Sequence, residues 1–212
     1  MSILKQKLRE KILAERPRTE KLLKEYGNVK VDEVTIGQII GGMRDIKSLV
    51  TDISYLDPFE GIRFRGFTIP EVLEKLPKVT GKDMPSVEAF FYLLLTGDIP
   101  TAAEVDAVHE EFNNRKEVPK YVYDVLRAMP KDSHPMTMFA TGIMSMQKDS
   151  IFVKEYHKGI KKGDYWEAYY EDSMNLLAKL PELGAFIYRL KYRNGDIIAG
   201  DPTLDFGGNF AQ

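Results

Sequence analysis

The chain has 212 residues, of which 43% are hydrophobic and 29% are charged, the balance of an ordinary globular protein. This length suffices for one sizeable core or two small domains. A formal net charge of -2 excludes a general attraction to nucleic acid, and the lack of cysteine excludes disulfides and thiolate metal sites. No apolar run approaches the roughly 20 residues that span a bilayer, so neither nucleic acid nor membrane is expected as a partner.

Residues 1–40 are predicted to form amino-terminal helices. Apolar residues recur with helical spacing from Ile3 to Leu13. Arg16-Pro17 is expected to interrupt this helix, because proline disfavours helical geometry in the residue before it. Thr19 can cap a second helix that ends at Gly27-Asn28, and a short helix is predicted from Thr35 to Ile40.

The basic, amphipathic start of the chain raises the question of a mitochondrial transit peptide. Such peptides are rich in serine and poor in acidic residues. Here Ser2 is the only serine of the stretch, and glutamates interrupt the basic residues: Glu10, Glu15, Glu20 and Glu25. The sequence therefore favours a mature surface helix and a cytoplasmic protein of bacterial type over a protein of the mitochondrial matrix. Binding of this helix to an anionic membrane is a less favoured alternative.

Residues 41–66 form the least helical stretch and predict a β-hairpin. Leu49 to Leu56 is rich in residues that suit a strand, and apolar residues alternate with arginines from Ile62 to Arg65. Between them, Asp57 to Gly61 reads as a five-residue loop, with Pro58 presetting the turn.

Residues 67–195 are predicted to form a helical core, and residues 196–212 a loop without periodicity. Helix starts are indicated at Thr68, Ser86, Thr101, Pro119, Ser133 and Asp164, of which Thr101 with Glu104 has the spacing of a capping box. Pro181 is expected to kink or restart the last helix. The expected fold is all-α, with one small antiparallel β-hairpin near residues 49–66.

None of the three histidines reads as a catalyst or a metal ligand. His134 precedes a proline at a helix start, where a neutral ring serves structure, and His109 and His157 are expected on solvated faces. No two histidines have the spacing of a helical metal site, so no metal is expected. The carboxylates Asp57 and Glu60 fit turn chemistry better than acid–base chemistry.

Several phrases of the sequence closely resemble citrate synthases of the eukaryotic type. They keep their order and spacing along nearly the whole chain, and they match the amino-terminal half of the family. The resemblance implies a multi-helical citrate-synthase-like large domain, of which residues 1–212 are the amino-terminal portion. The phrases include Gly41-Gly42-Met43-Arg44, Leu56-Asp57-Pro58, Glu60-Gly61-Ile62-Arg63-Phe64-Arg65-Gly66, Ser133-His134-Pro135-Met136 and Leu177-Ala178-Lys179-Leu180-Pro181.

The resemblance implies condensation of acetyl-coenzyme A with oxaloacetate and water to citrate, the first step of the citric acid cycle. In the family, an aspartate removes the methyl proton and two histidines polarise the carbonyls, and their motifs lie in the other half. We therefore expect no catalytic residue here, no permanently bound cofactor, an inactive isolated chain, and a homodimer. The alternative is a helical dimerisation or interaction module without activity of its own.

Two basic residues are implied to bind coenzyme A. Arg44 matches a family arginine that contacts a phosphate of the coenzyme, and its alternative is an exposed arginine beside a hairpin. Lys162 occupies a position where relatives can carry an arginine that reaches the coenzyme of the partner subunit. Lysine keeps the charge but loses the bidentate fork, so a solvated surface role is the alternative.

Overall fold

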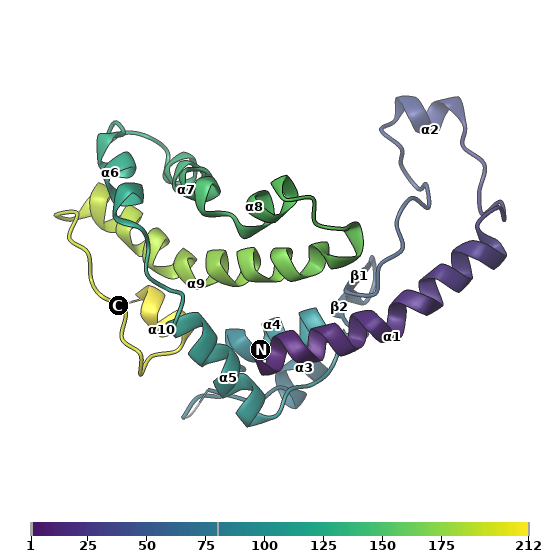
Figure 1. Cartoon of the computed structure of the whole chain (residues 1–212), viewed down its shortest axis with the longest axis horizontal. Helices are drawn as coiled ribbons and strands as arrows, with labels where there is room; N and C mark the ends of the chain where they lie inside the picture. The colour runs from purple at the N-terminus through teal and green to yellow at the C-terminus, as the bar shows by residue number, and fades with distance from the viewer. Residues whose placement is uncertain (1, 80, 212) are drawn as a thin grey trace.

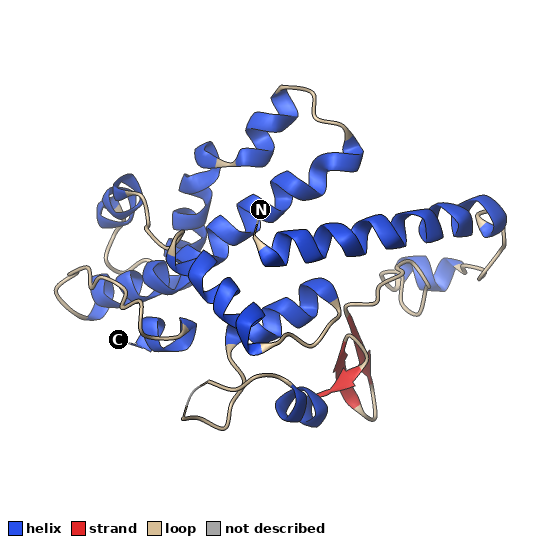
Figure 2. Cartoon of the chain, turned by 60° about the horizontal axis from the view of Figure 1, so that its bottom comes forward, coloured by secondary structure: helices blue, strands red, loops and turns tan. Residues whose placement is uncertain are grey.

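A computed structural model of the chain describes residues 2–79 and 81–211. Two long helices, α1 (Ile3–Tyr26) and α9 (Tyr165–Tyr192), dominate it, and a small sheet lies at one edge (Figures 1 and 2). The predicted all-α fold with a small antiparallel hairpin is confirmed. The other helical elements are α2 (Ile36–Ile40), α3 (Ile69–Lys75), α4 (Val87–Thr96), α5 (Ala102–Asn113), α6 (Lys120–Ala128), α7 (Pro135–Ser145), η1 (Met146–Asp149), α8 (Ile151–His157), η2 (Lys162–Asp164) and α10 (Phe206–Ala211).

Local capping signals start most of these helices where the sequence predicts. Thr35, Thr68 and Thr101 each form a full capping box, in which the threonine hydroxyl accepts from a backbone N–H of the first turn. Ser86 caps α4 by accepting from the N–H of Ala89. A side-chain oxygen at these positions satisfies a backbone donor that the helix leaves without a partner.

The two helices with a proline in their interior, α1 and α9, continue through it, which corrects the predicted break at Arg16-Pro17. In α1 the Thr19 hydroxyl donates to the carbonyl of Glu15 at 3.2 Å, and the helix runs on to Tyr26. Losing one backbone bond costs less than ending a helix and nucleating a new one. Pro181 likewise lies inside α9, whose span runs unbroken to Tyr192.

The sheet has three antiparallel strands in the order β1-β2-β3, one more than the predicted hairpin. β1 (Ser54–Asp57) pairs with β2 (Gly61–Phe64) so that Asp57 faces Gly61. β3 (Phe67–Thr68) then pairs with β2. The predicted first strand therefore begins too early, because β1 starts at Ser54 and, before it, only the Ile53 carbonyl bonds across, to the N–H of Arg65 at 2.8 Å.

Three hydrophobic clusters form the core, and α9 joins two of them. Helices α6, α7 and α9 enclose the first, and α1, α4, α5 and α9 enclose the second (Figure 1). The third cluster lies between α3 and α4, where Phe64 of β2 packs edge-on against Phe90 at 4.9 Å. This aromatic contact packs the sheet against the helices.

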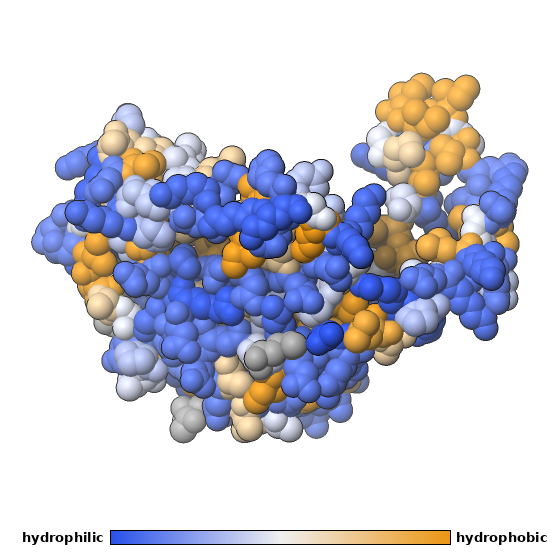
Figure 3. Space-filling view, viewed as in Figure 1, coloured by the Kyte–Doolittle hydropathy of each residue, from blue (hydrophilic) through white to orange (hydrophobic). Residues whose placement is uncertain are grey.

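Residues 28–53, called the arm below, project from this body. None of them is buried, and α2 exposes Ile36 by 76% and Ile40 by 81%. Figure 3 shows these apolar side chains gathered on the projecting end of the molecule. The conformation of the arm depends on hydrogen bonds within its own turns, and few of its side chains pack against the helical body.

The tail is ordered by polar contacts and ends in a helix, which corrects the predicted loop over residues 196–212. The Asp205 carboxylate accepts from the N–H of Gly208 at 2.6 Å at the start of α10. The Asn209 amide donates to the carbonyls of Asp201 and Leu204, both at 2.9 Å. Gln212 lies outside the described residues. Among the described helices, none combines the length and hydrophobicity that crossing a bilayer needs.

Candidate functional site

Arg44 lies in a turn that directly follows α2. Gly42, Met43 and Asp45 all have positive φ, of 81°, 63° and 59°. Left-handed geometry costs a residue with a side chain about 1–2 kcal/mol, so this turn is strained on both sides of Arg44. The Gln38 amide, which also completes the capping box of α2, donates to the Arg44 carbonyl at 3.3 Å and ties the turn to the helix.

The guanidinium of Arg44 is exposed to solvent. Within residues 2–79 and 81–211, no side chain or carbonyl bonds to it and no carboxylate pairs with it. A free guanidinium offers five N–H donors in a planar fork that fits a phosphate. Arg44 therefore presents a guanidinium that is free to bind an anion, on a turn that Gln38 holds to α2.

Lys162 lies in the η2 turn that leads into α9. Its side chain is exposed, and the described part of the chain supplies no carboxylate within salt-bridge distance. The next carbonyl, that of Gly163, accepts a 2.6 Å hydrogen bond from Arg16 of α1. Arg44 and Lys162 thus lie on separate elements of the chain.

The hairpin carboxylates take structural roles, as the sequence predicts. Asp57 accepts from the backbone N–H groups of Phe59 and Glu60, both at 2.8 Å. These bonds, the one from Glu60 foremost, lower the pKa of Asp57. Glu60 pairs with Arg63, with 2.6 Å between its carboxylate and Nη2, and this hydrogen bond raises the pKa of Arg63.

Arg65 is a structural anchor that the sequence analysis missed. Its φ is 50°, and its guanidinium donates to the carbonyls of Leu94 at 2.9 Å and Leu95 at 3.3 Å. These carbonyls belong to the last turn of α4, where a helix leaves acceptors unsatisfied. The guanidinium also pairs with Asp52 of the arm at 2.9 Å. The only sequence signal is an arginine next to Gly66, which does not identify the partner helix.

Two of the histidines behave as predicted. His134 caps α7, because its Nδ1 accepts from the backbone N–H of Met136 at 3.2 Å. His157 is exposed at the end of α8.

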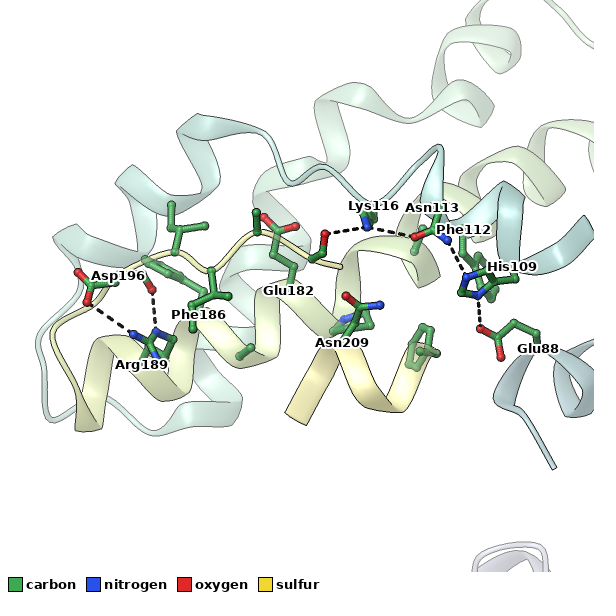
Figure 4. A pocket seen from close by; sticks show the side chains of 18 residues that line it. Glu88, His109, Phe112, Asn113, Lys116, Glu182, Phe186, Arg189, Asp196 and Asn209 are labelled. Carbon is green, nitrogen blue, oxygen red and sulfur yellow. Dashed lines mark hydrogen bonds and ion pairs between the residues drawn. The ribbon is translucent and has the colours of Figure 1, made fainter. Parts of the chain in front are cut away.

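His109 corrects the prediction of a solvated role. Its Nδ1 lies 3.1 Å from the carboxylate of Glu88, which is only 2% exposed, and its Nε2 lies 2.8 Å from the Asn113 amide (Figure 4). Nε2 also lies 3.3 Å from the carbonyl of Pro202, so the neutral ring carries its proton on Nδ1 when Nε2 accepts from Asn113 and on Nε2 when it donates to Pro202. The prediction failed because α5 turns this apparently polar face toward the start of α4.

This histidine lines a cavity of about 60 Å³ between α5, α9 and the tail. Its walls are mostly apolar, with Phe112, Phe186 and Ile197 among them, and Arg189 with Asp196 lies at the opposite end from Glu88 (Figure 4). Such a volume admits a few water molecules and not a coenzyme. The second Glu88 oxygen has no protein partner among the described residues, so a water is its natural donor.

The described residues contain no group of three or more histidine, cysteine, aspartate or glutamate side chains that is able to hold a metal ion. The candidate site thus consists of two free cations on separate elements, beside a scaffold of capped helices.

Curated relatives match almost the whole chain. The mitochondrial citrate synthases of Daucus carota and Saccharomyces cerevisiae are 46% and 45% identical over 209 residues. A mitochondrial 2-methylcitrate synthase of Yarrowia lipolytica is 44% identical over 210 residues. These alignments cover 99% of this chain but 44% to 45% of the relatives, so the chain spans less than half of their length.

These names overturn two of the sequence-based interpretations. The relatives are named as mitochondrial proteins, which contradicts the predicted cytoplasmic, bacterial-type location. A separate interaction module is also set aside, because enzymes match the chain over 99% of its length.

Solved structures agree on the fold. Citrate synthase from Pyrobaculum aerophilum superposes with a TM-score of 0.67 at 22% identity, covering 81% of this chain and 40% of that one. The ternary complex of citrate synthase from Thermoplasma acidophilum with carboxymethyl coenzyme A and oxaloacetate gives 0.62 at 16% identity, covering 80% and 40%. At these identities the likeness establishes the fold alone.

A family model described as the C-terminal domain of citrate synthase matches residues 42–212, which include the hairpin, the helical core and the tail. The match covers well over half of the chain, and the relatives extend it through α1. The chain belongs to the citrate synthase family.

Proposed function

We propose that this chain takes part in the condensation of acetyl-coenzyme A with oxaloacetate and water to citrate and coenzyme A. The observation that carries the proposal is the 46% identity to a citrate synthase over 99% of the chain. Because the chain spans 44% of that relative, the reaction belongs to a protein or assembly that also supplies the remaining length.

The chemistry sets what the remaining length must provide. Removing a proton beside the thioester carbonyl needs a carboxylate base, and the enolate oxygen needs a hydrogen-bond donor. In the hairpin, Asp57 accepts from backbone N–H groups of the turn and Glu60 pairs with Arg63. We propose that this chain corresponds to the amino-terminal half of the family and carries no catalytic residue.

Arg44 and Lys162 are the proposed coenzyme-binding residues. Both are exposed cations without a carboxylate partner among the described residues, as a phosphate-binding group should be before its ligand arrives. The proposal includes a homodimer in which α9 and the helices between Ser86 and Gln147 contribute the interface, so that Lys162 reaches the coenzyme bound to the partner subunit.

The product 2-methylcitrate is the second candidate, because a relative of that name is 44% identical over the same portion. Its extra methyl group would come from propionyl-coenzyme A in place of the acetyl donor. The shared mitochondrial names favour the mitochondrial matrix as the location for either reaction.

A complementation assay tests the proposal. The chain is mixed with a separately expressed carboxy-terminal half of the Daucus carota enzyme, and coenzyme A release is followed with acetyl- and propionyl-coenzyme A. We expect no activity from either half alone, activity from the mixture, and a faster rate with the acetyl donor. Activity of the chain alone would contradict the non-catalytic assignment, and an inactive but stable complex would contradict the proposed reaction.

A further inference from the structure

Lys179 of α9 lines a cleft that the proposed reaction does not use. The cleft has a volume of about 510 Å³ and lies between α9, the segment after α5 and the junction of η1 with α8. In Figure 1, α8 lies beside α9. A space of this size admits a small organic molecule or the reactive end of a larger one.

The side-chain nitrogen of Lys179 has no acidic partner. Its Nζ donates to the backbone carbonyls of Arg115 at 2.7 Å and Asn175 at 3.0 Å. No carboxylate of the described residues lies within 4.0 Å of it. Two carboxylates that line the cleft are engaged elsewhere: Asp172 accepts from two backbone N–H groups of α8, at 2.7 and 3.0 Å, and Asp149 accepts from a tyrosine hydroxyl.

The surroundings of Lys179 favour its neutral amine. Burial lowers the pKa of Lys179 below its ordinary value, and the charge of Arg115 lowers it further. The two cationic side chains meet at Asn175, whose amide oxygen accepts from Arg115 Nη1 at 2.9 Å. Carboxylates beyond 4.0 Å act in the opposite direction and do not reverse the shift: Asp149, Glu117 and Glu182. An amine that is withdrawn from water and placed beside another cation is an activated nucleophile.

We propose that Lys179 is an acylation site, which takes the acetyl group of a thioester such as acetyl-coenzyme A. The neutral amine has two N–H bonds, and the carbonyls of Arg115 and Asn175 are placed to accept both, so the lone pair is left to attack the thioester carbonyl carbon. A C–N bond forms, the C–S bond breaks, and the thiol leaves with the proton that the nitrogen loses. The inference rests on the proposed function only for the supply of the donor.

Acetylation would change a contact between two elements. It removes the positive charge and leaves the nitrogen with one N–H. Lys179 can then keep only one of its two carbonyl bonds. The bond to Arg115 is the one that joins α9 to the segment after α5, whereas the bond to Asn175 lies within α9.

Peptide mass spectrometry on the full chain tests the site, with the initial rate of acetylation followed at each lysine. Two probes are used: acetyl-coenzyme A, and S-acetyl-N-acetylcysteamine, a short thioester without a nucleotide. Lys191, the other lysine of α9, is the internal control, because its Nζ also donates to two backbone carbonyls, those of Lys131 and Ser133. We expect Lys179 to react at least about threefold faster than Lys191 at pH 7.5 with both probes, because more of its amine is neutral. The ratio should shrink at pH 10, where both amines lose protons, and should approach one in 8 M urea.

Arg115→Gln tests the contribution of the neighbouring charge. Arg18→Gln is the matched control, because the Arg18 side chain is 81% exposed and pairs with Glu15. Removing the charge of Arg115 should lower the ratio of the Lys179 rate to the Lys191 rate by about twofold, whereas Arg18→Gln should leave it unchanged. A melting curve checks that each variant is folded; if Arg115→Gln is not, the pH dependence of the ratio in the unchanged chain decides.

The outcomes separate this inference from the proposed function. Equal rates at Lys179 and Lys191 at pH 7.5, or a ratio that does not change with pH, would overturn the inference. If the short thioester prefers Lys179 in a chain that does not bind coenzyme A, the inference stands and the proposed coenzyme-binding role fails. If coenzyme A binds and neither probe prefers Lys179, the inference alone fails.

Discussion

Glu182 of α9 is a carboxylate whose surroundings disfavour its charge. It is half-buried and accepts a hydrogen bond from the Tyr123 hydroxyl. Burial raises the pKa of Glu182 above its ordinary value. The folded state therefore binds the proton more tightly than the unfolded state does, and stability is lost as pH rises through the folded pKa.

Glu182→Gln is expected to stabilise the chain at pH 7, because an amide keeps an acceptor for Tyr123 and removes the charge. Solvent screening limits the gain to about 1 kcal/mol, or about 2–4 °C in Tm. Thermal melts at pH 7 and pH 4 would measure it, and the gain should shrink at pH 4, where the wild-type carboxyl takes up a proton. Glu182→Ala, which leaves the Tyr123 hydroxyl without its acceptor, is the destabilised control. An equal Tm change at both pH values would contradict the charge argument.

Arg44→Ala should weaken coenzyme A binding by about tenfold, the loss of one charge-assisted contact. Arg9→Ala is the control, because Arg9 is an exposed arginine on α1 outside the proposed site. The measurement is a calorimetric Kd for coenzyme A, with a melting curve to confirm that the turn after α2 remains intact. Equal affinities for Arg44→Ala and Arg9→Ala would remove Arg44 from the proposed site.

Among the elements, the hairpin depends on one arginine for its attachment to α4. Arg65→Ala would leave the carbonyls of Leu94 and Leu95 and the carboxylate of Asp52 without that partner. We expect the free energy of unfolding to fall by about 1–3 kcal/mol, because these groups lose their hydrogen-bond partner. Urea denaturation would show this as a lower midpoint. Arg63→Ala removes an exposed pair with Glu60 and an exposed hydrogen bond to the carbonyl of Gly66, so its effect should stay below about 1 kcal/mol. Similar midpoints for both variants would show that Phe64 packing, and not Arg65, holds the hairpin.

An element could be predicted from the sequence when the contacts that stabilise it join residues close together in the chain. Capping by Thr35 and Thr101 depends on residues three apart, so the sequence reveals it directly. The continuity of α1 through Pro17 depends on the balance between one lost bond and a new nucleation, which local rules misjudge. The ordering of α10 depends on neighbours far along the chain, as the Lys82–Asp205 pair shows.

Residues of the candidate site could be predicted from the sequence only where the residue type by itself indicates a ligand. Arg44 and Lys162 stand out because a phosphate needs cations, and the family phrases mark their positions. Arg65 carries no such signal: its bonds to the carbonyls of Leu94 and Leu95 arise only when the hairpin lies against α4. His109 was misjudged for the same reason, since its partner Glu88 lies on another helix.

On the scale of the whole molecule, stability is concentrated along α9. This helix contributes to two hydrophobic clusters, with Met174 and Leu183 fully buried in them. The arm, in contrast, has no buried residue and contacts the body near its end through the Asp52–Arg65 pair and the hydrogen bond from the Arg65 N–H to the Ile53 carbonyl. Local opening of such a segment requires almost no loss of packing, whereas opening of α9 requires disrupting the core.

Hydrogen exchange followed by mass spectrometry should therefore distinguish the arm from α9. Peptides from residues 28–53 are expected to exchange within seconds at pH 7 and 25 °C, and peptides from residues 174–187 to be protected by several kcal/mol, near the global free energy of unfolding. Titrating the chain with the carboxy-terminal half of a relative provides the second condition, because exposed apolar residues such as Ile40 and Val50 are suited to a protein partner. Protection of the arm in the chain alone, rising with its concentration, would show instead that self-association covers it. Protection that appears only with the added half would place the arm in the contact between the two portions, and would make α2 part of the enzyme's assembly.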